Sequence, residues 1–382
     1  MGIKGKYWAI NVSKGLKYMI LSFNVLFFLL LFLSTLAPLT SPFEFVFISY
    51  LGLGFPILLF INICFLIVWI VFLRWKYAVI QFVALVFCWS AISTYIPLNS
   101  PTKTIPSKTF KVMSYNVRGF DWLTGDEARN NPIFSYIANS GADIICMQEF
   151  AVEEKKSKDN TDKIISLEEL DAIMVEYPYR SIIRLGDTIN SCMYGLACYS
   201  KYPIEKVARV PIESAFNGSG MYEIKIGKKS VTIVNNHLES NRLTYEDKIL
   251  FKELVIDRNR DKLDAVTQTI RSHLDPAFKA RAVQANIIAD CIKLQRDKTD
   301  AMIVCGDFNE PPISYAYETI KGSFLDSFKY TGRGMGITYH EDGFYFRIDY
   351  IMHSLNLQSY NCTVGDVKYS DHYPIWTWLK FK

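Results

Sequence analysis

Hydrophobic positions divide the chain into an apolar first quarter and a longer part in which apolar and polar stretches alternate. Three apolar runs fill the first hundred residues, at about 16–39, 45–73 and 77–98. Each reaches the ~20 residues that a helix needs to cross a bilayer. We therefore expect residues 1–99 to form a membrane anchor of three transmembrane helices. A signal peptide explains the first run less well, because no convincing small-residue cleavage site is present and two more apolar runs follow.

From about residue 110 onward, short apolar or β-branched runs alternate with helix-prone stretches. This alternation is typical of an α/β sandwich, which we expect over residues 110–382. A stretch rich in Pro, Ser, Thr and Lys precedes the first run and predicts a linker over residues 100–109. The charged segment from Leu243 to about Ile292 is either a crossover helix with a solvated face or a helical cap over a site.

Polar side chains end several of these apolar runs. They are, in chain order, Asn116, Glu149, His237, Asp307 with Asn309, Asp349, and Asp371 with His372. A polar residue at the end of a buried strand opens onto the edge of its sheet, where a shared site can form. Carboxylates, amides and imidazoles gathered at one edge indicate a divalent metal and phosphoester chemistry. Singly, each has an ordinary explanation, such as a core histidine for His237, but together they favour one site.

This ordered series, including Gly306-Asp307-Phe308-Asn309 and Ser370-Asp371-His372, resembles the endonuclease/exonuclease/phosphatase superfamily over residues 110–382. The resemblance implies a DNase-I-like, four-layer α/β sandwich. It also implies that Glu149 binds Mg²⁺ with help from Asn116 and Asp371. Hard oxygen ligands select Mg²⁺, with Mn²⁺ as a substitute.

The same resemblance implies roles for the remaining polar residues. The residue that matches Asp307 orients or deprotonates the attacking water, and the one that matches Asn309 holds a phosphate oxygen. His237 matches a histidine that contacts the phosphate or assists the leaving group. His372 with Asp349 forms a His–carboxylate pair, in which His372 acts as general base or as a cationic phosphate clamp. The sequence leaves open which of Asp307 and His372 takes the proton.

Charge is distributed unevenly along the chain. The first hundred residues hold six basic residues and one acidic residue, which leaves 36 basic and 37 acidic residues in the rest. The basic residues flank the apolar runs, at Lys4, Lys6, Lys14, Lys17, Arg74 and Lys76. The positive-inside rule then places the N-terminus and the turn at residues 74–76 in the cytoplasm. We expect a multi-pass protein of the inner (cytoplasmic) membrane with an extracytoplasmic catalytic domain.

The expected function is hydrolysis of phosphoesters in lipid head groups or in small extracytoplasmic molecules, with the lipid bilayer contacted through residues 16–98. No protein partner is predicted. The alternative is an exported DNase-like nuclease, which the missing basic excess disfavours, since counterion release supplies much of nucleic-acid affinity. A third possibility, a receptor or assembly factor on an inactive nuclease fold, is disfavoured because every expected catalytic side chain is present.

Overall fold

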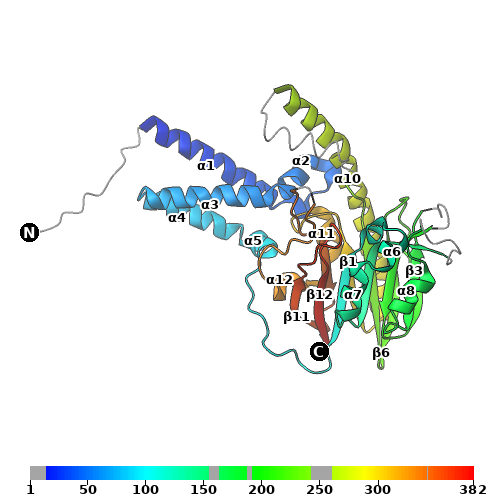
Figure 1. Ribbon diagram of the computed structural model, residues 1–382. Coiled ribbons are helices and arrows are strands. Elements are labelled where there is room, and N and C mark those ends of the chain that lie inside the picture. The colour runs from blue at the N-terminus through cyan, green and yellow to red at the C-terminus, as the bar shows by residue number, and fades with distance from the viewer. Residues whose placement is uncertain (1–13, 155–162, 187–191, 242–259, 342) are drawn as a thin grey trace, which may run out of the picture.

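Two six-stranded sheets form the centre of the computed structural model, which describes residues 14–154, 163–186, 192–241, 260–341 and 343–382 (Figure 1). The first sheet has the order β11-β12-β1-β2-β4-β3 and the second the order β5-β6-β7-β8-β10-β9. The strands of the first sheet are β1 (Phe110–Asn116), β2 (Ile144–Glu153), β3 (Tyr179–Arg184), β4 (Cys192–Ser200), β11 (Leu357–Val364) and β12 (Ile375–Phe381). Those of the second are β5 (Ile204–Arg209), β6 (Gly218–Ile226), β7 (Lys229–His237), β8 (Ala301–Asp307), β9 (Leu325–Asp326) and β10 (Asp349–His353).

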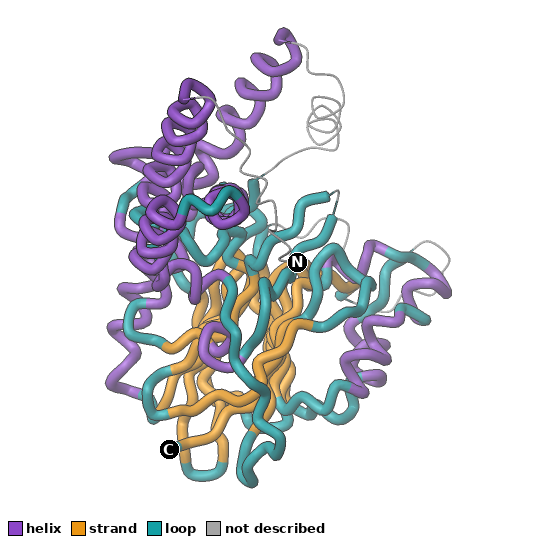
Figure 2. Tube along the Cα trace, turned by 90° about the vertical axis from the view of Figure 1, so that its left-hand side faces the viewer, coloured by secondary structure: helices purple, strands orange, loops and turns teal. Residues whose placement is uncertain are grey.

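Helices cover the outer face of each sheet, so the chain from residue 110 onward forms four layers (Figure 2). The first sheet packs against α7 (Pro132–Asn139) and α8 (Leu167–Ile173), next to the short α6 (Gly125–Arg129). The second packs against α10 (Arg260–Gln295) and α11 (Tyr315–Lys321), with α12 (Ser327–Thr331) nearby. Apolar side chains of both sheets fill the central layer. The predicted α/β sandwich is therefore confirmed.

The charged segment predicted between Leu243 and Ile292 contains α10, whose described part runs over 36 residues. Residues 242–259 lie outside the described residues, so the choice between a crossover helix and a cap is not decided there. Lys4 and Lys6, which support the predicted orientation, also lie outside the described residues.

The apolar segment, residues 15–95, departs from the prediction of three continuous helices. Its elements are α1 (Lys14–Ser34), the 3-10 turn η1 (Ala37–Leu39), α2 (Pro42–Leu53), α3 (Phe55–Val71), α4 (Trp75–Phe87) and α5 (Trp89–Tyr95). One stretch, Gly15–Leu39, is long and apolar enough to cross a membrane as a helix. The other two predicted spans are bent pairs, α2 with α3 at 54° and α4 with α5 at 67°, which qualify only if each pair counts as one span.

The bends have local causes. Gly54 ends α2 directly before Phe55-Pro56, and proline is favoured in the first turn of a new helix. Phe45 has non-helical backbone angles (φ −142°, ψ 81°) inside α2. As a result α2 bends away from the line of α3, and it contacts both α1 and α10 (Figure 1). Residues 45–73 are therefore a bent pair of helices rather than one continuous helix, and the three predicted spans stay a prediction.

Candidate active site

Strand register brings the predicted site residues to one edge of the sandwich. β1 and β2 are parallel, with Asn116 opposite Gln148, and β7 and β8 are parallel, with His237 opposite Asp307. The carboxyl ends of parallel strands meet at the same sheet edge. β10 runs antiparallel to β8 and places Asp349, its first residue, opposite Asp307. Asp307 is therefore flanked by a histidine on one side and a carboxylate on the other.

A β-bulge turns Glu149 toward this edge. The register between β2 and β4 shifts between Met147 and Phe150, and Glu149 has a positive φ of 50°. A bulge adds a residue that the partner strand does not match and re-aims its side chain, a common device beside active sites. The Glu149 carboxylate accepts a hydrogen bond from Asn116 Nδ2 at 3.0 Å and lies 3.5 Å from His237 Nε2.

Asp307 is the centre of the constellation and is buried. Its Oδ2 accepts from Asn116 Nδ2 at 3.0 Å and from Asn309 Nδ2 at 3.3 Å, and its Oδ1 accepts from the Asn309 backbone N–H at 2.8 Å. His372 Nε2 and His237 Nε2 lie 3.7 and 3.9 Å from the same Oδ2. Two histidines and two asparagines thus surround one buried carboxylate.

His372 and Asp349 form the predicted pair, with His372 Nδ1 and Asp349 Oδ2 2.8 Å apart. Burial alone would lower the pKa of His372, but Asp349 and Asp307 beside it raise that pKa well above its usual value. Burial raises the pKa of Asp307 to about 6, an effect that His372 opposes and Asp349 reinforces. At neutral pH this environment favours a charged imidazolium next to an ionised Asp307.

Asp371 lies at the rim of the same edge. The Ser370 hydroxyl donates to the Asn116 carbonyl at 2.9 Å and to Asp371 Oδ1 at 3.2 Å, which ties this turn to the end of β1. Arg118 Nε lies 3.8 Å from Asp371 Oδ2. The structure thus brings all eight predicted residues to one edge, with Asp371 also paired to an arginine.

The donor set fits a divalent cation. Asp307, Asp349 and His372 each offer a ligand atom within 4.8 Å of the others, and Asp349 Oδ1 is buried without a hydrogen-bond partner among the described residues. This group differs from the predicted set of Asn116, Glu149 and Asp371. We favour Glu149 as the principal ligand, because its side chain is 29% exposed and leaves room for the waters that Mg²⁺ retains, whereas both His372 nitrogens face carboxylates.

Two buried polar networks behind the site were not predicted from the sequence. Gln148 Nε2 donates to Asn235 Oδ1 at 2.6 Å, and Asn235 Nδ2 donates to the Met147 carbonyl at 3.1 Å, so amides link the two sheets. The Val-Asn-Asn-His run before Leu238 was the available signal, since two asparagines inside an apolar strand need buried partners.

The second network connects α10 to the ends of β7 and β8. Arg281 Nε donates to Glu310 Oε1 at 2.8 Å, Arg281 Nη1 donates to the Glu239 carbonyl at 2.8 Å, and Gln284 Oε1 accepts from the Glu239 N–H at 2.9 Å. Leu238, next to Glu239, accepts from Asn309 Nδ2 at 2.9 Å. This network fixes the backbone on which His237 and Asn309 sit.

A family model described as the endonuclease/exonuclease/phosphatase family matches residues 113–372, which include every predicted site residue. The chain belongs to the endonuclease/exonuclease/phosphatase family. Members of this family are metal-dependent phosphoester hydrolases, and the chain is an enzyme of that class. A second model, a domain of unknown function (DUF8431), matches residues 17–95. No curated protein matches the chain.

Several solved structures are similar to this chain. The endonuclease/exonuclease/phosphatase from Bacteroides vulgatus is 19% identical with a TM-score of 0.50, and the match covers 72% of this chain and 100% of that one. The family protein from Beutenbergia cavernae is 13% identical over 72% of each chain, with a TM-score of 0.49. The human nocturnin catalytic domain is 14% identical over 72% of this chain and 94% of that one, with a TM-score of 0.49.

Proposed function

We propose that the protein is a membrane-anchored, Mg²⁺-dependent phosphoester hydrolase in which Mn²⁺ can replace Mg²⁺. The observation that carries this proposal is the buried Asp307 carboxylate, surrounded by Asn116, His237 and His372 within 3.9 Å. Burying a carboxylate is costly, and buried ionisable groups with shifted pKa values are typical of functional sites.

In this proposal Glu149, Asn116 and Asp371 hold the cation, which when bound supplies positive charge to the phosphoryl oxygens. Asp307 orients the attacking water and accepts its proton, because its pKa of about 6 leaves it ionised at neutral pH. His372, kept charged by Asp349, serves as a cationic clamp on the phosphate. Asn309 and His237 contact the remaining phosphate oxygens or the leaving group.

The proposed substrate is a phosphoester in a lipid head group or in a small molecule outside the cytoplasm. The apolar segment lies directly beside the catalytic part, and α2 exposes Phe43, Phe45 and Phe47, with 59%, 66% and 57% of their surface accessible. Exposed apolar side chains such as Phe are typical of helices that bury one face in the membrane surface. A reporter enzyme that works only outside the cytoplasm, fused after Lys382, tests the proposed location in the inner membrane. Activity restricted to a cytoplasmic reporter contradicts it.

One observation favours the second candidate, a nuclease. The Trp122 ring, 51% exposed, lies parallel to Tyr194 with centroids 6.4 Å apart, and Phe216, 52% exposed, meets Tyr194 edge-on at 5.9 Å. Burial raises the pKa of the Tyr194 phenol, and the nearby Glu149 carboxylate raises it further. The rings therefore lie close to Glu149 and the site. Exposed aromatic faces of this kind stack nucleobases.

The deciding experiment uses the full chain in detergent micelles, with Mg²⁺, Mn²⁺ or EDTA. Phospholipid and sphingolipid vesicles, a phosphomonoester, bis-p-nitrophenyl phosphate, plasmid DNA and RNA are assayed in parallel. Asp307→Asn is the blank, and Asp300→Asn, an exposed aspartate directly before the same strand, is its matched control. We expect metal-dependent cleavage of vesicles or small esters that Asp307→Asn lowers by at least ~10²-fold. Cleavage of DNA or RNA alone assigns the nuclease function instead.

A further inference from the structure

The apolar segment and the catalytic part meet directly at the loop that carries Asn309. Ile313, in this loop, is buried in a hydrophobic cluster made by the apolar segment, together with Ala37, Phe55 and Tyr95. Gly52 of α2 lies against the Ile313 backbone: a Cβ at Gly52 would stand 2.3 Å from the Ile313 carbonyl oxygen and 2.7 Å from Ala37 Cβ. Only glycine fits this contact, since real Cβ atoms do not approach so closely.

A stiff connection joins this contact to the site. The chain runs Asn309-Glu310-Pro311-Pro312-Ile313, and the two prolines hold their φ angles near −65°. Glu310 is held by Arg281, and Asn309 is held by Leu238 and Asp307. A displacement of Ile313 would therefore strain the contacts that hold Glu310 and Asn309, because the two prolines restrict how the chain between them can adjust.

α2 also contacts α10, which carries Arg281. The Tyr50 hydroxyl donates to Asp275 Oδ1, and the Tyr50 ring meets Phe278 edge-on with centroids 5.3 Å apart. Arg281 lies one turn further along α10, where it bonds the Glu239 carbonyl. The apolar segment thus contacts the Ile313 end of the Asn309 loop directly, and it contacts α10, which binds the backbone at Glu239.

A second contact supports the other side of the site. Arg347, 1% exposed, donates from Nη2 to the Thr94 carbonyl of α5, and its guanidinium lies 4.6 Å from the Phe328 ring centroid. Among the described residues its Nε and Nη1 have no hydrogen-bond partner. Asp349 follows two residues later. Without Thr94, this buried cation would lose its hydrogen bond to the protein backbone.

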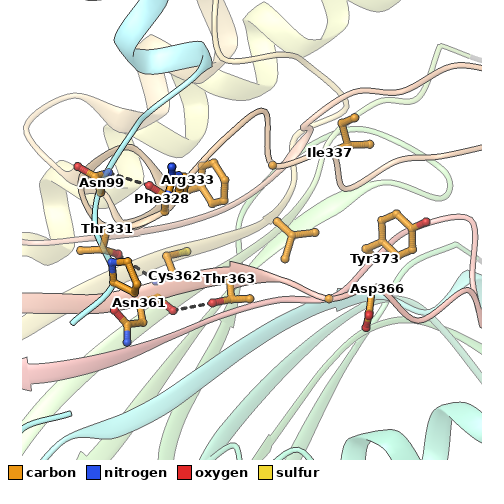
Figure 3. A pocket seen from close by; sticks show the side chains of 15 residues that line it. Asn99, Phe328, Thr331, Arg333, Ile337, Asn361, Cys362, Thr363, Asp366 and Tyr373 are labelled. Atoms are coloured by element: carbon orange, nitrogen blue, oxygen red, sulfur yellow. Dashed lines mark hydrogen bonds between the residues drawn. The ribbon is translucent and has the colours of Figure 1, made fainter. Parts of the chain in front are cut away.

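The chain between α5 and the predicted linker (residues 100–109) is docked on the catalytic part. The Gly334 N–H donates to the Pro97 carbonyl at 2.8 Å, and Asn99 Nδ2 donates to the carbonyls of Lys329 and Gly332 at 2.9 and 2.8 Å. Asn99 and Pro101 form one wall of a cavity of about 520 Å³ that Figure 3 shows between this strand, α12 and β11. Thr94, Pro97 and Asn99 thus hold the end of the apolar segment and the chain that follows it against the catalytic part.

We propose that the apolar segment is a positioning element of the active site, in which Gly52, Tyr50 and the Thr94 carbonyl hold the Asn309 loop and the Asp349 strand in their working geometry. This inference rests on the proposed function, because it assigns a task to the anchor of the same enzyme. It follows that turnover depends on contacts made by helices that bind neither substrate nor metal.

Gly52→Ala in the full chain tests the inference, with Gly15→Ala as the matched control because an added Cβ there meets nothing within 4 Å. We expect Gly52→Ala to lower kcat at least ~10-fold with KM changed less than twofold, since small misplacements of catalytic groups carry large penalties. Hydrogen exchange over residues 307–314 should be faster than in Gly15→Ala. A role in stability alone would lower the unfolding midpoint and leave kcat per folded molecule unchanged.

Tyr50→Phe, which keeps the ring and removes the bond to Asp275, is the second variant if Gly52→Ala does not fold, with Tyr18→Phe as its control. We expect kcat to fall as in Gly52→Ala, but only about threefold, because one of several contacts is lost. Wild-type kcat together with unchanged exchange over residues 307–314 overturns the inference. If the wild-type chain cleaves no substrate, the proposed function fails, and the exchange measurement alone decides the inference.

Discussion

Removing Arg281 should destabilise the catalytic part in a way that depends on pH. The Arg281–Glu310 pair is almost fully buried, with 1% and 5% of the side chains exposed and 2.8 Å between Nε and Oε1. At an effective dielectric constant of 20 the attraction at this distance is about 6 kcal/mol, which burial of two charges largely offsets. Arg281→Met removes the attraction and leaves the buried Glu310 carboxylate, so we expect a loss of about 3–5 kcal/mol near neutral pH.

The pH dependence follows from Glu310. Burial already raises the pKa of Glu310, and Arg281 opposes that rise. In Arg281→Met the pKa of Glu310 therefore increases further. An unfolded glutamate has a pKa of about 4.3. When the pKa is higher in the folded state, the group stabilises the folded state at low pH, and this stabilisation is lost as pH rises through the folded-state pKa. The penalty of Arg281→Met should accordingly be smaller at pH 5 than at pH 8.

Pulse proteolysis of the detergent-solubilised chain in urea measures the free energy of unfolding at both pH values. The double variant Arg281→Met with Glu310→Met should recover most of the loss at pH 8, because no unpaired charge remains. A penalty below about 1 kcal/mol that is equal at both pH values would refute the reasoning. The reasoning would also be refuted if the losses of unfolding free energy in the two single variants simply added up in the double variant, because residues in direct contact are expected to couple.

Three further outcomes are expected. Burial lowers the pKa of His353, so the free energy of unfolding should fall as pH drops below about 6.5, and His353→Gln should flatten this dependence in urea titrations at pH 5–8. Gly306→Ala should prevent folding, because φ is +120° and a Cβ would lie 2.0 Å from the Asn236 carbonyl oxygen. Gly227→Ala is the control: it shares the strain of a positive φ (+61°) but its Cβ meets nothing within 4 Å, and soluble expression of both variants would contradict the prediction. Mg²⁺ should raise the unfolding midpoint of the wild type, and Glu149→Gln should abolish the rise; an equal rise in both would remove Glu149 from the metal site.

The candidate site was predictable because its residues lie at the ends of strands, and strand ends can be recognised in a single sequence. An apolar run followed by Asn116, His237 or Asp307 marks the end of a strand, and parallel neighbours must end at one edge. The family and the fold followed from the order of these boundaries. The roles assigned to the single residues stay predictions until the variants are measured.

Other features depend on contacts that no local pattern contains. Arg347 has the sequence context of a surface residue beside a strand, but it is buried because α5 supplies the Thr94 carbonyl. The bend between α2 and α3 is signalled by Gly54 and Pro56, but its angle of 54° depends on packing that the sequence does not show. The bulge that aims Glu149 requires the register with β4, which lies more than forty residues further along the chain.

The contact between Gly52 and Ile313 joins two parts of the chain that are synthesised at different times. Residues 37–53 leave the ribosome more than 250 residues before Ile313, and domains generally fold in the order of their synthesis. The apolar segment is then already in place when the Asn309 loop emerges, and it acts as a template on which that loop closes. If the apolar segment is the proposed membrane anchor, the active site is completed only after that anchor has inserted, and a chain that is not inserted would lack the contacts that position the Asn309 loop.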